Sequence, residues 1–145
     1  MNITFEGKSP FLAMYRIVLE KAIHDVCEKL SLTPSPEITW IIFDSNRDLS
    51  QLSPMEQMIV KSWPREGHEY GHCNPKSKKI WISTMAIESY NIAAMPSIRI
   101  PGIKPVDCLL ANVIMDELAH INTGRNHGDP VYDRELISYR SRYYS

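Results

Sequence analysis

Three side chains that can ligate a metal ion lie close together in the last third of the chain. Asp116 and His120 are four residues apart, so on a helix they share one face and can hold one ion from the same side. His127 follows seven residues later and can supply a third ligand if the chain turns back after the helix. A Zn²⁺ ion with three protein ligands keeps its fourth position for water and lowers the pKa of that water to about 7. The spacing therefore predicts a catalytic metal site formed by Asp116, His120 and His127.

A carboxylate beside this ligand set predicts a hydrolytic reaction. Glu117 lies about 100° round the helix from Asp116, near enough to hold a water on the ion without ligating the ion itself. In that place it can take a proton as the water attacks a carbonyl group, and it can then pass the proton to the leaving amine. We therefore expect Glu117 to be the general base in the hydrolysis of a peptide bond.

The helix that carries these residues is expected to run through the core. From about Pro105 onward, apolar residues recur over a broad arc of a helix, and Gly124 is placed to end that helix as its C-cap. Asn112 shares one face with Asp116 and His120, and a buried polar group without a partner costs about 1–3 kcal/mol. A hydrogen-bonded Asp–His pair is the simpler explanation of two of these side chains. The further histidine and glutamate nearby favour a metal ion instead.

The N-terminal half is predicted to supply one long helix and one buried strand. Ser9-Pro10 is typical of a helix start, and apolar residues then recur at helical spacing until the chain reaches Pro34. Residues 38–43 are β-branched and aromatic, which favours a buried strand. Residues 44–67 are polar and rich in turn-forming residues, with a short helix expected at 55–60.

The second half is predicted to add a hairpin before the metal-site helix and another helix after it. Strands near residues 68–73 and 79–83 flank a turn at 74–78. Residues 86–104 are expected to form an irregular connection, after a short helix near 85–90, that serves as a wall or lid beside the substrate. The last helix is expected to pack one stripe on the core, made of Tyr132, Leu136, Tyr139 and Tyr143.

The order of these residues resembles the signature of a protease family. The chain reads Asp116-Glu117-Leu118-Ala119-His120, then six residues, then His127-Gly128-Asp129-Pro130-Val131-Tyr132. This pattern resembles that of the SprT/WLM-like minimal gluzincin metalloproteases, which is H-E-x-x-H, a short gap and then H-G-x-x-[FY]. The resemblance extends over residues 68–140 and includes the hairpin that precedes the motif.

The resemblance implies both a fold and an activity. The fold would be α+β: a compact zincin-like domain with an N-terminal helix, a small antiparallel-rich sheet, a core active-site helix and a C-terminal helix. The activity would be hydrolysis of a peptide or protein substrate with Zn²⁺, along an edge strand that aligns the substrate. Separately from the resemblance, we expect Tyr132, which lies five residues after His127, to flank the metal as a contact to the substrate or the transition state.

The family pattern has a histidine where this chain has Asp116. An aspartate ligates zinc at about 2.0–2.2 Å, but a set of two histidines and one carboxylate also suits Fe²⁺ or Mn²⁺. The added negative charge makes the ion a weaker Lewis acid. Three outcomes stay open: a slow peptidase, an enzyme with a different metal, and a catalytically inactive zincin-like module that binds a protein partner.

Two other histidine patterns fit less well. Metzincins have H-E-x-x-H-x-x-G-x-x-H and a later methionine turn, whereas Gly124 and His127 each come one residue too late and Met115 is the last methionine. Single-strand endoribonucleases of ribosome maturation space their ligands as H-x-x-x-H-x-x-x-x-x-H. This chain departs from that spacing at the first ligand and by one residue at the last.

Length and composition limit the remaining choices. At 145 residues, the chain predicts a single domain that spans residues 1–145. Sixteen basic and 17 acidic residues give a formal net charge of -1, so nucleic acid is not expected as a partner. Three well-separated cysteines, no signal-peptide pattern and no long apolar run predict a cytoplasmic protein with reduced thiols and no membrane span. The oligomeric state is not defined by any of these features.

Overall fold

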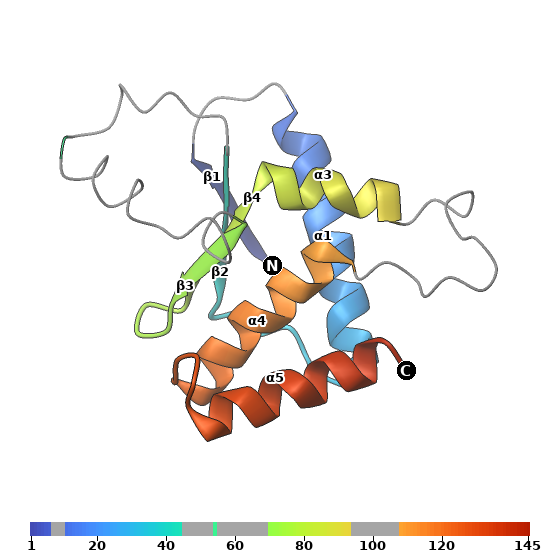
Figure 1. The fold of residues 1–145 in the computed structure, drawn as a ribbon. Coiled ribbons are helices and arrows are strands. Elements are labelled where there is room, and N and C mark those ends of the chain that lie inside the picture. The colour runs from blue at the N-terminus through green and yellow to red at the C-terminus, as the bar shows by residue number, and fades with distance from the viewer. Residues whose placement is uncertain (7–10, 45–53, 55–69, 94–107) are drawn as a thin grey trace.

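The described part of the chain is a four-stranded sheet with helices packed on it. A computed structural model describes residues 1–6, 11–44, 54, 70–93 and 108–145 (Figure 1). The elements in chain order are β1 Asn2–Glu6, α1 Leu12–Lys29, β2 Thr39–Phe43, β3 Gly71–Asn74, β4 Lys79–Ser83, α3 Thr84–Ala93, α4 Leu109–Thr123 and α5 Pro130–Tyr143. This architecture confirms the α+β class that was expected from the sequence.

The sheet differs from the expected one in the direction of its strands. Its order is β1-β2-β4-β3, and β1, β2 and β4 are parallel to one another. Of the described strands, only β3 runs antiparallel to its neighbour, β4. The expectation of an antiparallel-rich sheet is therefore wrong. The physical reason is β1, which the sequence analysis missed: α1 connects β1 to β2, and such a long crossover is what parallel pairing requires.

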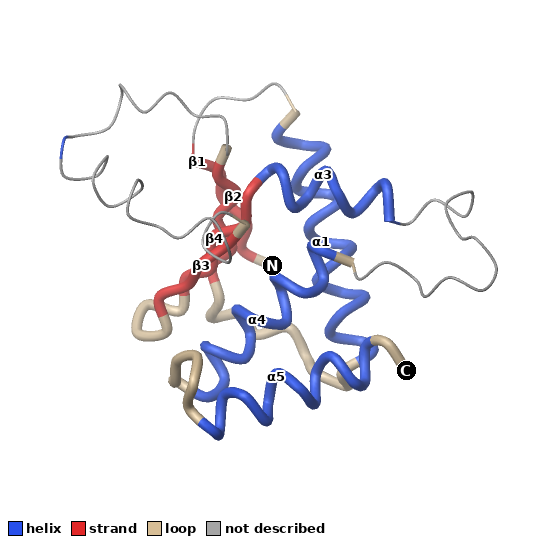
Figure 2. Tube along the Cα trace, in the orientation of Figure 1, coloured by secondary structure: helices blue, strands red, loops and turns tan. Residues whose placement is uncertain are grey.

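The helices cover one face of this sheet, and the core lies between the two layers (Figures 1 and 2). α1 directs an apolar stripe toward the sheet, and its Leu19, Ile23 and Val26 are fully buried. β2 contributes Trp40 and Ile42 to the same apolar cluster. Burial of an aliphatic side chain of this size contributes about 1.5–3 kcal/mol. The cluster therefore fixes the sheet against the helices that carry the candidate site.

The first helix ends earlier than its prolines suggested. Its last residue is Lys29, Leu30 is the C-cap, and Ser31 has a positive φ of 54°. The helix is thus closed before the chain reaches Pro34. The predicted start at Ser9-Pro10 lies outside the described residues. Among the described helices, α1 included, none is long and apolar enough to cross a membrane.

The hairpin and the helix after it follow the prediction. β3 and β4 pair across the predicted turn, where Asn74 Oδ1 accepts a hydrogen bond from the backbone N–H of Lys76 at 3.1 Å. α3 extends the short helix that was expected near residues 85–90. The helix expected at 55–60, and the wall or lid expected beyond α3, lie outside the described residues.

α4 runs through the core, as its apolar pattern predicted. In the structure it follows Cys108, while the predicted start near Pro105 lies outside the described residues. β3 packs against α4, and Gly71 allows this close approach. A Cβ atom on residue 71 would lie 2.6 Å from Val113 Cγ1 of α4 and 2.9 Å from the carbonyl oxygen of Trp81. The edge strand and the helix with the predicted ligands therefore lie side by side.

Candidate metal site

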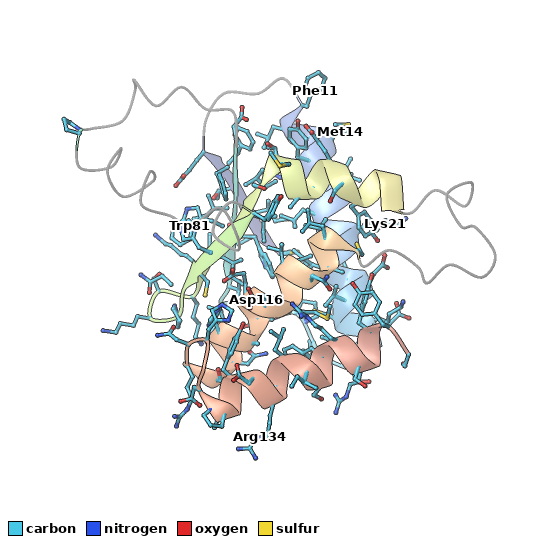
Figure 3. All side chains as sticks on the ribbon, in the orientation of Figure 1. Phe11, Met14, Lys21, Trp81, Asp116 and Arg134 are labelled. Atoms are coloured by element: carbon cyan, nitrogen blue, oxygen red, sulfur yellow. The ribbon has the colours of Figure 1, made fainter. Side chains whose placement is uncertain are left out.

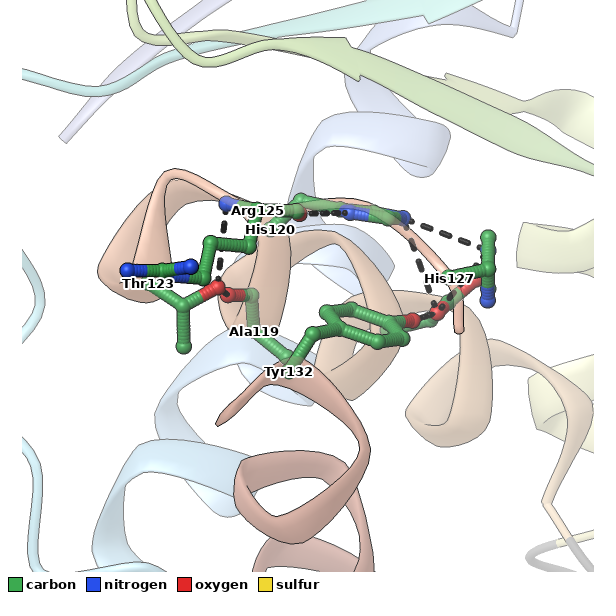
Figure 4. A network of polar contacts seen from close by, with 7 residues as sticks. Ala119, His120, Thr123, Arg125, His127 and Tyr132 are labelled. Carbon is green, nitrogen blue, oxygen red and sulfur yellow. Dashed lines mark hydrogen bonds and ion pairs between the residues drawn. The ribbon is translucent and has the colours of Figure 1, made fainter. Parts of the chain in front are cut away.

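The structure brings the three predicted ligands, Asp116, His120 and His127, to one point. α4 carries Asp116 (labelled in Figure 3) and His120 one turn apart, and the loop after α4 brings His127 beside them (Figure 4). Asp116 Oδ1 lies 3.9 Å from His120 Nε2 and 3.7 Å from His127 Nε2. The two histidine Nε2 atoms are 3.3 Å apart. Together these side chains form a group that could hold a metal ion.

The triangle formed by these three atoms has the size that a transition-metal ion needs. From the three separations, the point in the plane of the three atoms that is equidistant from them lies about 2.1 Å from each, and zinc binds nitrogen and carboxylate oxygen at about 2.0–2.2 Å. Two imidazole nitrogens and one carboxylate oxygen are also donors that divalent zinc, iron and manganese accept. The residues present therefore fit a divalent ion in both spacing and donor type.

Two glycines and a helix cap shape the loop that carries His127. Gly124 is the left-handed C-cap of α4, as predicted, with a φ of 66°. Gly128 also has a positive φ, of 87°. Asp129 caps α5 by accepting a backbone hydrogen bond from its first turn at 2.9 Å, and its carboxylate pairs with Arg125 at 2.9 Å. These contacts define both ends of the short segment that holds His127.

His120 has the tautomer that a metal ligand requires. Its Nδ1 lies 2.8 Å from the carbonyl oxygen of Arg125 (Figure 4). A carbonyl oxygen only accepts hydrogen bonds, so Nδ1 carries a proton, and Nε2 is the ring nitrogen that faces the site and can ligate an ion. His120 is buried, whereas the side chain of His127 is 68% exposed and approaches from the solvent side. The site thus has one buried imidazole and one exposed imidazole.

Tyr132 flanks the ligands from the first turn of α5. Its hydroxyl donates a hydrogen bond to Asp116 Oδ1. Its ring stacks on His120, with centroids 4.3 Å apart and an interplanar angle of 18°, and meets the edge of His127 at 4.8 Å. The whole residue is 0% exposed. Tyr132 therefore lies beside the ligand set, as expected, with its hydroxyl committed to Asp116, and its contact with a substrate stays a prediction.

Glu117, the predicted general base, is buried next to the ligands at 4% exposure. Burial raises the pKa of its carboxyl group from an ordinary value of 4.5 to about 8; a hydrogen bond with the Cys73 thiol lowers the pKa, and the charge of Asp116 raises it. Within the described part of the chain, its Oε2 has no hydrogen-bond partner. A buried carboxyl group with a perturbed pKa and an open acceptor is typical of catalytic sites.

Cys73 is a neighbour of the site that the sequence analysis did not select. It lies on β3, and burial, followed by the charge of Glu117, raises the pKa of its thiol. The signal that could have found it is strand alternation: residues 71 and 73 project to the same side of β3, and Gly71 is the position that contacts α4. Cys73 therefore meets Glu117 because β3 lies directly against the helix.

Three other polar residues do not join the ligand set. Asn112 Oδ1 accepts a hydrogen bond from the Tyr144 hydroxyl at 2.7 Å, at the far end of α5. His72 stacks on Trp81 with the ring centroids 4.5 Å apart. His24 is exposed on α1. Asp116 is thus the polar residue of its helical face that meets the two histidines.

The three candidate ligands and the buried glutamate all lie on α4 and in the loop that follows it. The chain has no match among protein-family models, curated proteins or solved structures. A functional proposal for this chain is therefore argued from the geometry of these side chains.

Proposed function

We propose that this chain is a metal-dependent peptidase of the zincin type, which hydrolyses peptide bonds in a peptide or protein substrate. One observation carries the proposal. Asp116, His120 and His127 converge at metal-binding spacing, and Glu117, which follows Asp116 on α4 and interacts with its charge, is buried. A general base next to a three-ligand site is the arrangement that metal-assisted hydrolysis needs.

Zn²⁺ is the metal that we propose, with Fe²⁺ and Mn²⁺ as alternatives. Zinc fits the separations of the three ligand atoms, and two histidines with one carboxylate also form the usual set for iron. When bound, the ion would polarise the attacking water and the carbonyl group of the scissile bond.

Glu117 would move the proton in this reaction. In the metal-free protein its carboxyl group has a pKa of about 8, so at neutral pH it holds a proton. A cation beside it favours the carboxylate form and lowers the pKa. A group whose pKa lies near the working pH can both accept a proton from water and return it to the leaving amine. Burial and the neighbouring cation would therefore act in opposite directions to give Glu117 this intermediate pKa.

β3 is suited to align the substrate. It is at the edge of the described sheet, with β4 as its partner there. An extended peptide can add to such an edge through main-chain hydrogen bonds. Cys73 of β3 contacts Glu117, so a peptide along this strand would pass close to the proposed base.

Metal analysis of the purified protein is the first test of the proposal. We expect one transition-metal ion per chain, removable by a chelator. His127→Ala should abolish binding, whereas His24→Ala, which changes another exposed histidine, should retain it. A protein that binds none of Zn²⁺, Fe²⁺ and Mn²⁺ would refute the proposal.

Hydrolysis of a mixed peptide library by the metal-loaded protein is the second test. Glu117→Gln should abolish cleavage while the metal content stays the same, and Glu28→Gln, a change of an exposed carboxylate on α1, should have no effect. Equal cleavage by wild type and Glu117→Gln would reject Glu117 as the base. Bound metal with no cleavage by any variant would favour the inactive protein-binding module over the peptidase.

A further inference from the structure

We infer that Tyr132 is a positioning residue for the metal ligand Asp116, and that its hydroxyl adapts the site to a carboxylate in place of a histidine. This inference rests on the proposed metal site. It concerns the role of a residue that carries no ligand atom of the group itself.

The contact between Tyr132 and Asp116 lies at the centre of the site. The oxygen that accepts the tyrosine hydrogen bond is Oδ1, the same atom that lies 3.9 Å and 3.7 Å from the two histidine Nε2 atoms. An ionised carboxylate offers about four lone-pair positions on its two oxygens. Asp116 can therefore accept the tyrosine hydrogen bond and ligate an ion at the same time.

An aspartate at this position needs such a contact more than a histidine would. Its side chain is short, has no ring to pack against neighbours, and brings a negative charge to the ion. A hydrogen-bond donor holds the carboxylate in one orientation, and it also draws negative charge away from the ligating oxygen. His120 has a comparable partner in the Arg125 carbonyl at 2.8 Å. Both helical ligands are thus held by a group behind them.

Burial makes the tyrosine contact effective. Tyr132 is 0% exposed and the side chain of Asp116 is 20% exposed, so little water competes for the hydrogen bond. The ring of Tyr132 stacks on His120 independently of the hydroxyl. A phenylalanine at residue 132 would keep this stacking and remove only the hydrogen bond, so the two contributions can be separated by experiment.

Tyr139 provides a matched control on the same helix. It lies about two helical turns after Tyr132, it is 3% exposed, and its hydroxyl accepts a hydrogen bond from Asn122 at 2.8 Å. Asn122 and Tyr139 are not part of the ligand group. Tyr139→Phe therefore removes a buried tyrosine hydroxyl of α5 without touching the metal ligands.

The experiment compares the two variants by metal affinity. Zn²⁺ would be titrated into metal-free wild type, Tyr132→Phe and Tyr139→Phe in competition with a chromophoric chelator. We expect Tyr132→Phe to bind zinc 10–100-fold more weakly, the usual effect of removing a group that holds a ligand, and Tyr139→Phe to stay within about twofold. The visible absorption bands of the Co²⁺-loaded protein should shift in Tyr132→Phe and not in Tyr139→Phe. Wild-type affinity and spectrum in Tyr132→Phe would overturn the inference.

A second background tests whether the hydroxyl acts through the carboxylate. Asp116→His restores the three-histidine set of the family pattern, and there Tyr132→Phe should change zinc affinity by less than about threefold, because the coupling is with Asp116. Equal losses in both backgrounds would assign the effect to packing against His120 and overturn the inference. If Asp116→His binds no zinc, the comparison with Tyr139→Phe decides the matter. A wild type that binds zinc, with Tyr132→Phe equal to it, refutes only this inference; a wild type that binds none refutes the proposed function as well.

Discussion

The buried carboxyl group of Glu117 should make the metal-free protein less stable as the pH rises. Its pKa is about 8 in the folded protein, against an ordinary value of 4.5. Between these two pH values the folded state holds one proton more than the unfolded state, so the free energy of unfolding falls as the pH increases. Below pH 4.5 both states are protonated and there is no penalty. Above pH 8 the penalty is complete.

The magnitude follows from the difference between the two pKa values. Each pKa unit corresponds to about 1.36 kcal/mol, so the full penalty from pH 4 to pH 9 is about 5 kcal/mol, and at pH 7 it is about 3 kcal/mol. Glu117→Gln removes this pH dependence, because an amide does not titrate. It also buries an amide with an unsatisfied group, at a cost of about 1–3 kcal/mol that is the same at every pH. The variant is therefore expected to be the less stable protein at pH 4 and the more stable one at pH 9.

The assay is urea denaturation of chelator-treated wild type and Glu117→Gln from pH 4 to pH 9. The quantity of interest is the difference in unfolding free energy between the two proteins, since titrating groups that do not interact with residue 117 contribute equally to both. Glu28→Gln, at an exposed position on α1, should show no pH-dependent difference. Parallel curves for wild type and Glu117→Gln over the whole range would refute the explanation, because they would mean that Glu117 is ionised with an ordinary pKa.

Three further predictions concern the packing of β3 on α4, the Cys73 thiol and the stabilisation of the protein by zinc. Gly71→Ala should lower the free energy of unfolding by about 1–3 kcal/mol through overpacking, since its Cβ would meet Val113 and the Trp81 carbonyl. Gly124→Ala has open space around it but a φ of 66°, so it should cost about 1–2 kcal/mol through its backbone conformation alone. If urea denaturation shows no loss of stability for Gly71→Ala, the close approach of β3 to α4 is contradicted. Burial and the charge of Glu117 both raise the pKa of the Cys73 thiol, so Glu117→Gln should speed the alkylation of Cys73 by iodoacetamide above pH 8. Mass spectrometry measures the rate, with Glu28→Gln as the control, and an unchanged rate would refute the contact between Cys73 and Glu117. Zn²⁺ at 100 times its dissociation constant should stabilise the wild-type protein by about 2.7 kcal/mol, and in a thermal shift assay it should leave the stability of His127→Ala unchanged. An equal gain in stability in His127→Ala would exclude His127 as a ligand.

The part of the site that lies on α4 was predictable from the sequence, because helical geometry fixes which side chains share a face. Asp116 and His120 lie one turn apart on any helix, and Gly124 was recognisable as the residue that ends it. The structure shows both features. These predictions depend on local backbone geometry alone, and for that reason they needed no knowledge of the rest of the fold.

The missed features depend on contacts between distant segments. β1 is five residues long, and its pairing joins Asn2 to Thr39, across the whole of α1. Such a short strand has little periodic signal of its own, and the sequence pattern does not state its partner. The contact of Cys73 with Glu117 likewise depends on how closely β3 packs on α4. Gly71 permits this close packing, but a glycine in the sequence does not by itself predict it.

The contact of Tyr132 with the proposed ligands depends on its exact position along α5, because a shift by one residue would turn the side chain away from the site. The family pattern would put its aromatic residue at position 131, one residue before Tyr132 in this chain. α5 begins at Pro130, and neighbouring residues on a helix point about 100° apart. Val131 is 41% exposed, whereas Tyr132 is fully buried against the ligands. The helical stripe of Tyr132, Leu136, Tyr139 and Tyr143 predicted which of the two positions faces the core, and the packing of α5 on α4 confirms it.

The charge of Asp116 links three features of the proposed site, which are the metal ligand, the general base and the tyrosine. With Zn²⁺ at the proposed site, Asp116 and an ionised Glu117 would balance the two positive charges of the ion, whereas three histidines and one glutamate would leave one positive charge in excess. A balanced site costs less to bury, but its ion is a weaker Lewis acid. The hydroxyl of Tyr132 acts against that second effect, because it draws negative charge from Asp116. Without the ion, burial and the charge of Asp116 keep Glu117 protonated at neutral pH. The aspartate that departs from the family pattern therefore raises the pKa of the proposed base as well as changing the proposed ligand set, and the Tyr132 hydroxyl is placed to moderate the charge of that aspartate.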